Sequence, residues 1–118
     1  MSEIAPRGDP SDPLSVAARS ALEATLEPGE RIDREAPAVG AHLLLTNRRL
    51  VVVRDGFEFR PKSGIRSWPL DGYLVLRLEQ GRVLIEQDGP AVGVFHTEAQ
   101  AAAVRSLVAK ARRALPRA

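Results

Sequence analysis

The middle of the chain, from Arg31 to His96, consists of short apolar runs separated by turns that contain glycine. The turns are Asp55-Gly56, Asp71-Gly72, Gln80-Gly81 and Asp88-Gly89. This cadence is typical of an antiparallel meander, because tight glycine turns join strands that lie side by side. We therefore predict eight β runs, at Arg31–Ala38, Ala41–Thr46, Arg49–Arg54, Phe57–Arg60, Ile65–Pro69, Tyr73–Glu79, Arg82–Gln87 and Ala91–Phe95.

Two of these runs, Leu43–Leu45 and Leu50–Val53, are apolar at every position. A strand with one wet face alternates between apolar and polar residues, as Tyr73–Glu79 does. An uninterrupted apolar run needs cover on both faces. We expect the opposite sheet to cover one face, and a helix or a partner chain to cover the other.

A leading helix is predicted at residues 12–27, with Asp12-Pro13 as its N-cap and first position and Pro28-Gly29 as its end. Arg19 and Glu23 are spaced i, i+4 and are expected to interact. One apolar stripe recurs every fourth residue, at Leu14, Ala18, Leu22 and Leu26.

A closing helix is predicted between Thr97 and Pro116. Thr97 and Gln100 form a capping box, in which each side chain bonds a backbone N–H of the first turn. The apolar stripe of this helix contains Val104, Leu107, Val108, Ala111 and Leu115. The fold class is therefore α+β, with two small antiparallel sheets or a partly open barrel that the closing helix plugs. We divide the chain into a disordered tail (1–11), an N-terminal helix (12–27) and one domain (28–115).

Four segments resemble bacterial pleckstrin-homology-like (PH-like, GRAM-like) domains. Leu26–Ile32 is similar to their "L..GE.I" opening and Ile65–Trp68 to an "I.sw" strand, while His42–Val53 resembles the "lllTnrRLvvv" hairpin. The helix after Phe95-His96-Thr97 matches the helix that caps the family's domain. The resemblance covers roughly residues 26–115. It implies a seven-stranded barrel of two orthogonal sheets, but little about function, because this fold hosts lipid binding, peptide binding and assembly.

The charge of the chain gives weak support to nucleic-acid or membrane binding. Seventeen cationic against 15 acidic residues leave a net charge of +2, and nucleic-acid-binding domains usually show a larger excess. PH domains that bind inositol lipids carry basic residues in the first hairpin loop, whereas residues 38–41 here read Ala-Val-Gly-Ala. The chain has no cysteine and no apparent signal peptide, so we expect a cytoplasmic protein, with peripheral membrane contact as an alternative.

Motifs for catalysis are missing from the sequence. It contains no Gly-rich phosphate loop, no GxSxG and no HExxH. His42 and His96 read as strand-edge histidines without a third metal ligand nearby. Ser63 and Ser67 near Lys62 read as an ordinary loop. We therefore predict a protein that is not an enzyme, and we infer no cofactor, metal or small-molecule substrate.

Arginines supply the candidate contact residues. A cluster at Arg54, Arg60, Lys62 and Arg66 could hold an anion or a partner. Arg48 and Arg49 lie in the Thr46–Arg49 turn, where an ion pair with Glu30 or Glu35 is one interpretation and contact with an anionic partner is the other. Trp68 is either a core residue or a surface anchor for a partner.

The function predicted from these patterns is a non-catalytic protein-interaction or scaffold module that self-associates. The two doubly apolar strands motivate this hypothesis, since a second copy could cover them if the leading helix does not. The alternative is weak binding of an anionic ligand, either an acidic lipid surface or a nucleic acid, through the arginine cluster.

Overall fold

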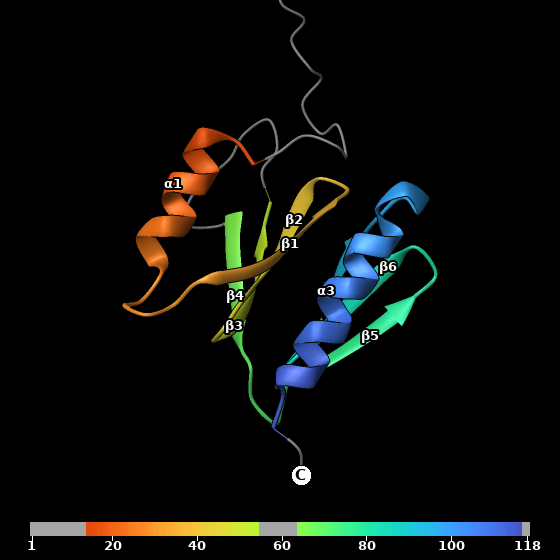
Figure 1. Cartoon of the computed structure of the whole chain (residues 1–118). Helices are drawn as coiled ribbons and strands as arrows, with labels where there is room; N and C mark the ends of the chain where they lie inside the picture. Colours follow the sequence, from red (N-terminus) through yellow and green to blue (C-terminus); the bar gives the residue numbers. More distant parts are fainter. Residues whose placement is uncertain (1–13, 55–63, 117–118) are drawn as a thin grey trace, which may run out of the picture.

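The fold is an α+β arrangement of two antiparallel sheets and two helices (Figure 1). The structure is a computed structural model that describes residues 14–54 and 64–116 of the 118-residue chain. The elements are α1 (Val16–Thr25), β1 (Ile32–Ala38), β2 (Ala41–Thr46), β3 (Arg49–Val53), β4 (Ile65–Pro69), β5 (Val75–Glu79), β6 (Arg82–Glu86), β7 (Val92–Phe95), the 3-10 turn η1 (Glu98–Gln100) and α3 (Ala101–Ala114).

Sequential antiparallel pairing builds both sheets, as the meander pattern predicts. Sheet A has the strand order β1-β2-β3-β4, and sheet B has the order β5-β6-β7. The two sheets do not form a closed barrel, because no strand of one pairs along its length with a strand of the other among the described residues. Single bonds join them instead: Val39 N–H donates to the Phe95 carbonyl (2.8 Å), and Arg54 Nη2 donates to the Gly93 carbonyl (3.2 Å).

The main core lies between the two sheets and α3. Leu45, Leu50 and Trp68 of sheet A meet Ile85 of sheet B and Leu107 of α3 in one apolar cluster. Trp68 is only 7% exposed, so the core interpretation of this residue is confirmed. The capping box of Thr97 and Gln100 is also confirmed, and it begins η1, which continues directly into α3.

A second apolar cluster lies on the other face of sheet A, under α1. Figure 1 shows α1 on one side of this sheet, and α3 with sheet B on the other. Ala18 and Leu22 of α1 pack on Leu44, Val51 and Val53. The prediction that β2 and β3 need cover on both faces is confirmed, and the helix that supplies the outer cover belongs to the same chain.

Local details of the leading helix differ from the prediction. Its N-cap is Ser15, whose hydroxyl accepts a hydrogen bond from the Ala18 amide, and the helix ends at Thr25. Asp12-Pro13 and the predicted tail lie outside the described residues, as does the predicted run Phe57–Arg60. Among the helices that the structure describes, none has the length and apolar character needed to span a membrane.

Candidate functional site

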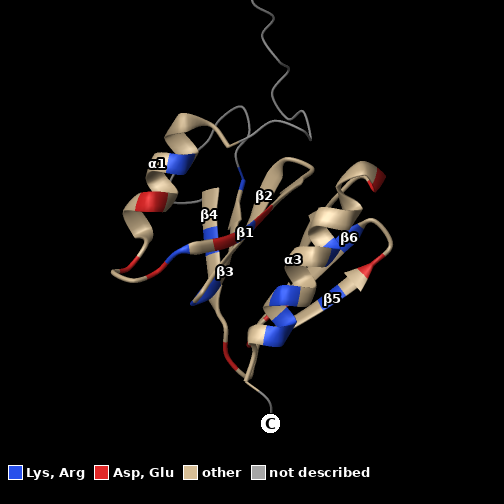
Figure 2. Ribbon diagram, viewed as in Figure 1, with Lys and Arg blue, Asp and Glu red and all other residues tan. Residues whose placement is uncertain are grey.

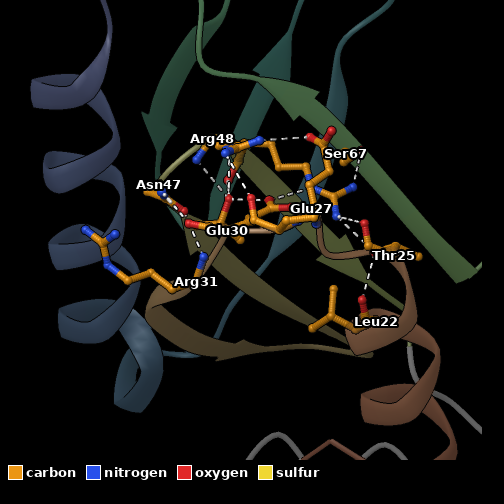
Figure 3. A network of polar contacts seen from close by, with 12 residues as sticks. Leu22, Thr25, Glu27, Glu30, Arg31, Asn47, Arg48 and Ser67 are labelled. Carbon is orange, nitrogen blue, oxygen red and sulfur yellow. Dashed lines mark hydrogen bonds and ion pairs between the residues drawn. The ribbon is translucent and has the colours of Figure 1, made fainter.

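The Thr46–Arg49 turn, which carries the most specific part of the family resemblance, is the centre of a polar network (Figure 3). The Thr46 hydroxyl accepts hydrogen bonds from the amides of Arg48 (3.0 Å) and Arg49 (2.9 Å), which closes the turn. Asn47 joins this turn to the chain before β1. Its Oδ1 accepts from the Arg31 amide (2.8 Å), and its Nδ2 donates to the Gly29 carbonyl (3.2 Å).

Glu30 is the buried acceptor of this network. Its side chain is fully buried, and its carboxylate accepts from Arg49 Nε (2.8 Å), the Thr46 hydroxyl (2.6 Å) and the Glu27 amide (3.0 Å). Burial alone would raise the pKa of Glu30. The hydrogen bonds from Arg49, Thr46 and Glu27, together with the Arg49 charge, outweigh burial and lower the pKa from 4.5 to about 2.

Both turn arginines therefore have structural partners. Arg49 Nη2 donates to the carbonyl (2.8 Å) and the hydroxyl (2.9 Å) of Thr25, so this side chain ties the end of α1 to β3 and Glu30. Arg48 donates to the Pro28 carbonyl (3.1 Å). The ion-pair interpretation is confirmed for Arg49, with Glu30 as the partner. Glu35 is the partner of Arg19 instead (2.9 Å), so the predicted pairing of Arg19 with Glu23 is wrong.

The lowered pKa of Glu30 predicts acid sensitivity. The folded state binds fewer protons than the unfolded state between pH 4.5 and pH 2, so the stabilisation from Glu30 is complete above about pH 5 and declines as the pH falls. We expect a loss of about 3 kcal/mol in the free energy of unfolding across this range. Urea unfolding at a series of pH values measures it. An equally steep decline in the Glu30→Gln variant would assign the effect to other carboxylates.

The predicted arginine cluster is described only in part, since Arg60 and Lys62 lie outside the described residues. Arg54 and Arg66 are exposed, and β3–β4 pairing places them near the same end of sheet A. Each also has an intramolecular contact. Arg54 donates to the Gly93 carbonyl, and the Arg66 guanidinium lies 5.4 Å from the centre of the Trp68 ring. These two arginines form a modest basic patch whose orientation is set by the fold.

The polar residues weighed for catalysis do not converge. His42 lies in β2, and His96 follows β7, with its Nδ1 3.0 Å from the Thr97 carbonyl oxygen. The described parts of the chain hold no cluster of three His, Cys, Asp or Glu side chains that could bind a metal ion. Ser67 accepts from Arg49 Nη1 (3.3 Å), and Ser63 and Lys62 lie outside the described residues.

An exposed apolar pair, Val39 and Phe95, lies where the β1–β2 turn meets the end of β7. Phe95 is 58% exposed and Val39 is 44% exposed, and their backbones share one of the hydrogen bonds that join the two sheets. The sequence analysis did not identify this pair, although the alternation of side chains along β7 predicts the exposure of Phe95. Because Val94 points into the core, its neighbour Phe95 must point outward.

A groove of about 430 Å³ separates the β5–β6 turn from the start of α3. Leu78 and Gly81 of the hairpin and Ala101 and Arg105 of α3 line this groove, together with His96. Nothing in the sequence pattern identifies this groove, because it depends on how the hairpin and the helix are placed relative to each other.

Comparisons with known proteins do not assign the chain to a family: no protein-family model, no curated protein and no solved structure matches it.

Proposed function

We propose that the protein is a non-catalytic protein-interaction module of PH-like fold that self-associates. Sheets of four and three antiparallel strands followed by a terminal helix support the fold assignment, because the resemblance of the sequence implies the same order of elements. The side chains of the Thr46–Arg49 turn are used for internal bonds, so the interaction surface must lie elsewhere.

The observation that carries the proposal is the exposed side chain of Phe95, whose backbone is bonded to that of the exposed Val39; we call these two residues the Val39–Phe95 patch. Aromatic side chains are enriched among the residues that contribute most to protein interfaces. The backbone of Phe95 is fixed by the bond from Val39, and the next residue, His96, donates to the Gly81 carbonyl (3.0 Å). A fixed anchor loses little conformational freedom on binding, which favours affinity.

A second copy of this chain is the partner that the surroundings of Phe95 favour. Arg82 lies opposite Phe95 in the β6–β7 pair and forms an ion pair with Glu79 (2.7 Å) on the neighbouring strand. In a two-fold arrangement about Phe95, Glu79 of one copy could face Arg82 of the other. Because α1 already covers its own sheet, this association does not involve exchange of that helix.

Sedimentation equilibrium tests the proposal. We expect the wild-type protein to form dimers, and Phe95→Ser to weaken the dimer by more than about ten-fold, because a central aromatic anchor is lost. Val16→Ser is the matched control: Val16 is 84% exposed but lies on α1, away from the patch. A wild-type protein that stays monomeric at the highest concentration reached would refute self-association, and an equal effect of Val16→Ser would refute the choice of surface.

Binding of an anionic ligand is the second candidate, and the shared position of Arg54 and Arg66 at one end of sheet A favours it. On this hypothesis, vesicles with phosphatidylserine or a single-stranded oligonucleotide bind the protein at low salt, and Arg66→Glu abolishes the binding. Binding that survives Arg66→Glu, or that does not depend on salt, would exclude this patch as the site.

A further inference from the structure

Strand β5 is an edge of sheet B, and the hydrogen-bonding pattern shows which of its backbone groups face away from the sheet. In an antiparallel ladder, residues bond alternately to the strands on either side. The Gly81 carbonyl accepts a hydrogen bond from the His96 amide. The backbone groups of Gly81 therefore point toward β7, and those of Arg82 point toward β5. Arg82 lies opposite Glu79, which therefore faces β6, while its neighbour Leu78 faces away.

The other end of this edge confirms the pattern. Leu76, two residues before Leu78, directs its carbonyl away from β6, where it accepts a hydrogen bond from Arg112 Nη2 of α3 (2.6 Å). Arg112 therefore occupies the edge at Leu76. The amide and carbonyl of Leu78 point the same way, and Leu78 lines the groove between the β5–β6 turn and α3.

The groove has the dimensions and walls that suit a few residues of extended chain. Its volume of about 430 Å³ lies in the range of small ligand sites. Leu78 is 36% exposed and provides an apolar contact, and the small side chain of Ala101 forms part of the opposite wall. A peptide in this position could bond to Leu78 as an added strand, with Arg112 limiting its length at the far end.

The charge of the helix wall favours an acidic peptide. Arg105 lines the groove and has no ion-pair or hydrogen-bond partner among the described residues. Helix α3 carries further basic residues but no Asp or Glu (Figure 2). Of the two carboxylates at the groove, Glu79 is neutralised by Arg82 (2.7 Å), and Glu98 lies at the start of η1.

We propose that this groove binds an extended acidic segment of a protein partner, which pairs with the edge of β5 at Leu78 and places a carboxylate against Arg105. The groove adjoins the Val39–Phe95 patch at Glu79 and His96 but has a different occupant, so it goes beyond the proposed self-association and does not depend on it.

An NMR titration of ¹⁵N-labelled protein tests the proposal, with Phe95→Ser as the background so that self-association does not contribute. The probe is acetyl-Val-Glu-Val-Glu-Val-amide. We expect saturable shifts at the amides of Leu78, Gly81 and Arg105, and slower hydrogen exchange at Leu78. The same peptide with its central valine N-methylated should bind more weakly, because it lacks a strand-pairing donor.

Charge variants complete the test. Arg105→Glu should weaken binding of the glutamate peptide roughly ten-fold, since a charge-assisted bond is lost. It should also improve binding of acetyl-Val-Lys-Val-Lys-Val-amide. Arg113→Glu is the matched control, because Arg113 is exposed on α3 but does not line the groove. The absence of saturable shifts, equal binding of the two peptides by the Phe95→Ser background, or no effect of N-methylation would overturn the proposal.

Discussion

Glu30→Ala is expected to lower the free energy of unfolding by about 3 kcal/mol, because it removes one partner of a buried ion pair. The carboxylate accepts three hydrogen bonds, and its loss leaves the Arg49 guanidinium, only 19% exposed, without its carboxylate partner. The Thr46 hydroxyl also loses this acceptor and keeps only the longer bond to the Arg49 carbonyl (3.2 Å). Urea unfolding followed by the fluorescence of Trp68, the single tryptophan, measures the change.

The matched control for Glu30→Ala is Glu27→Ala, because Glu27 lies only three residues before Glu30. Glu27 pairs with Arg48 at 3.6 Å, but both side chains are largely exposed, so Glu27→Ala should cost less than about 1 kcal/mol. A double variant, Glu30→Met with Arg49→Leu, should recover part of the stability lost in Glu30→Ala, since no buried charge is left alone. If Glu30→Ala and Glu27→Ala lower the free energy of unfolding by the same amount, the polar network around Glu30 does not stabilise the Thr46–Arg49 turn.

Leu22→Ala is expected to cost about 3 kcal/mol, the usual range for a large-to-small change in a core. Leu22 is fully buried between α1 and the outer face of sheet A, where it packs with Leu44, Val51 and Val53. Losing this contact weakens the cover over two apolar strands, so the whole domain should unfold at a lower urea concentration. The same unfolding experiment measures the effect.

The Leu22 result also decides how α1 relates to the rest of the chain. Val16→Ala is the control on the same helix, because Val16 is exposed, and we expect it to change stability by less than about 0.5 kcal/mol. If Leu22→Ala releases the amides of α1 to hydrogen exchange while the unfolding of the sheets is unchanged, the helix is a separate unit, as the division at residues 27 and 28 implies. A cooperative loss would make α1 part of one domain.

The two small antiparallel sheets of the prediction are confirmed, whereas the barrel that the family resemblance implies is not closed in the structure. Strand runs and glycine turns predict pairing between neighbours in the chain, and every described strand pair is of this kind. Closure of a barrel requires pairing between strands that are far apart in the sequence, and the hydrophobic periodicity of a strand does not predict its distant partner. Isolated hydrogen bonds, such as those from Val39 to Phe95 and from Arg54 to Gly93, join the two sheets instead.

The candidate site was harder to predict than the fold. The Thr46–Arg49 motif was found from the sequence, and its interpretation as an ion-paired turn is correct for Arg49. Arg19 pairs with Glu35 rather than with Glu23, because packing α1 on sheet A brings a charge from β1 within reach. The arginine cluster stays a prediction for Arg60 and Lys62, while Arg54 and Arg66 each have a contact within the chain.

By itself, the sequence determined the local structure of this protein. The spacing of apolar residues, the glycines in the turns and the Thr97 cap specify strands and helices, because each acts through interactions within a few residues. Only the tertiary structure decided that α1 covers its own sheet, that Glu30 is buried against Arg49, and that Leu78 of β5 and Arg105 of α3 line one groove. These features join segments distant in the chain, and their energies depend on burial and orientation, which a linear pattern does not contain.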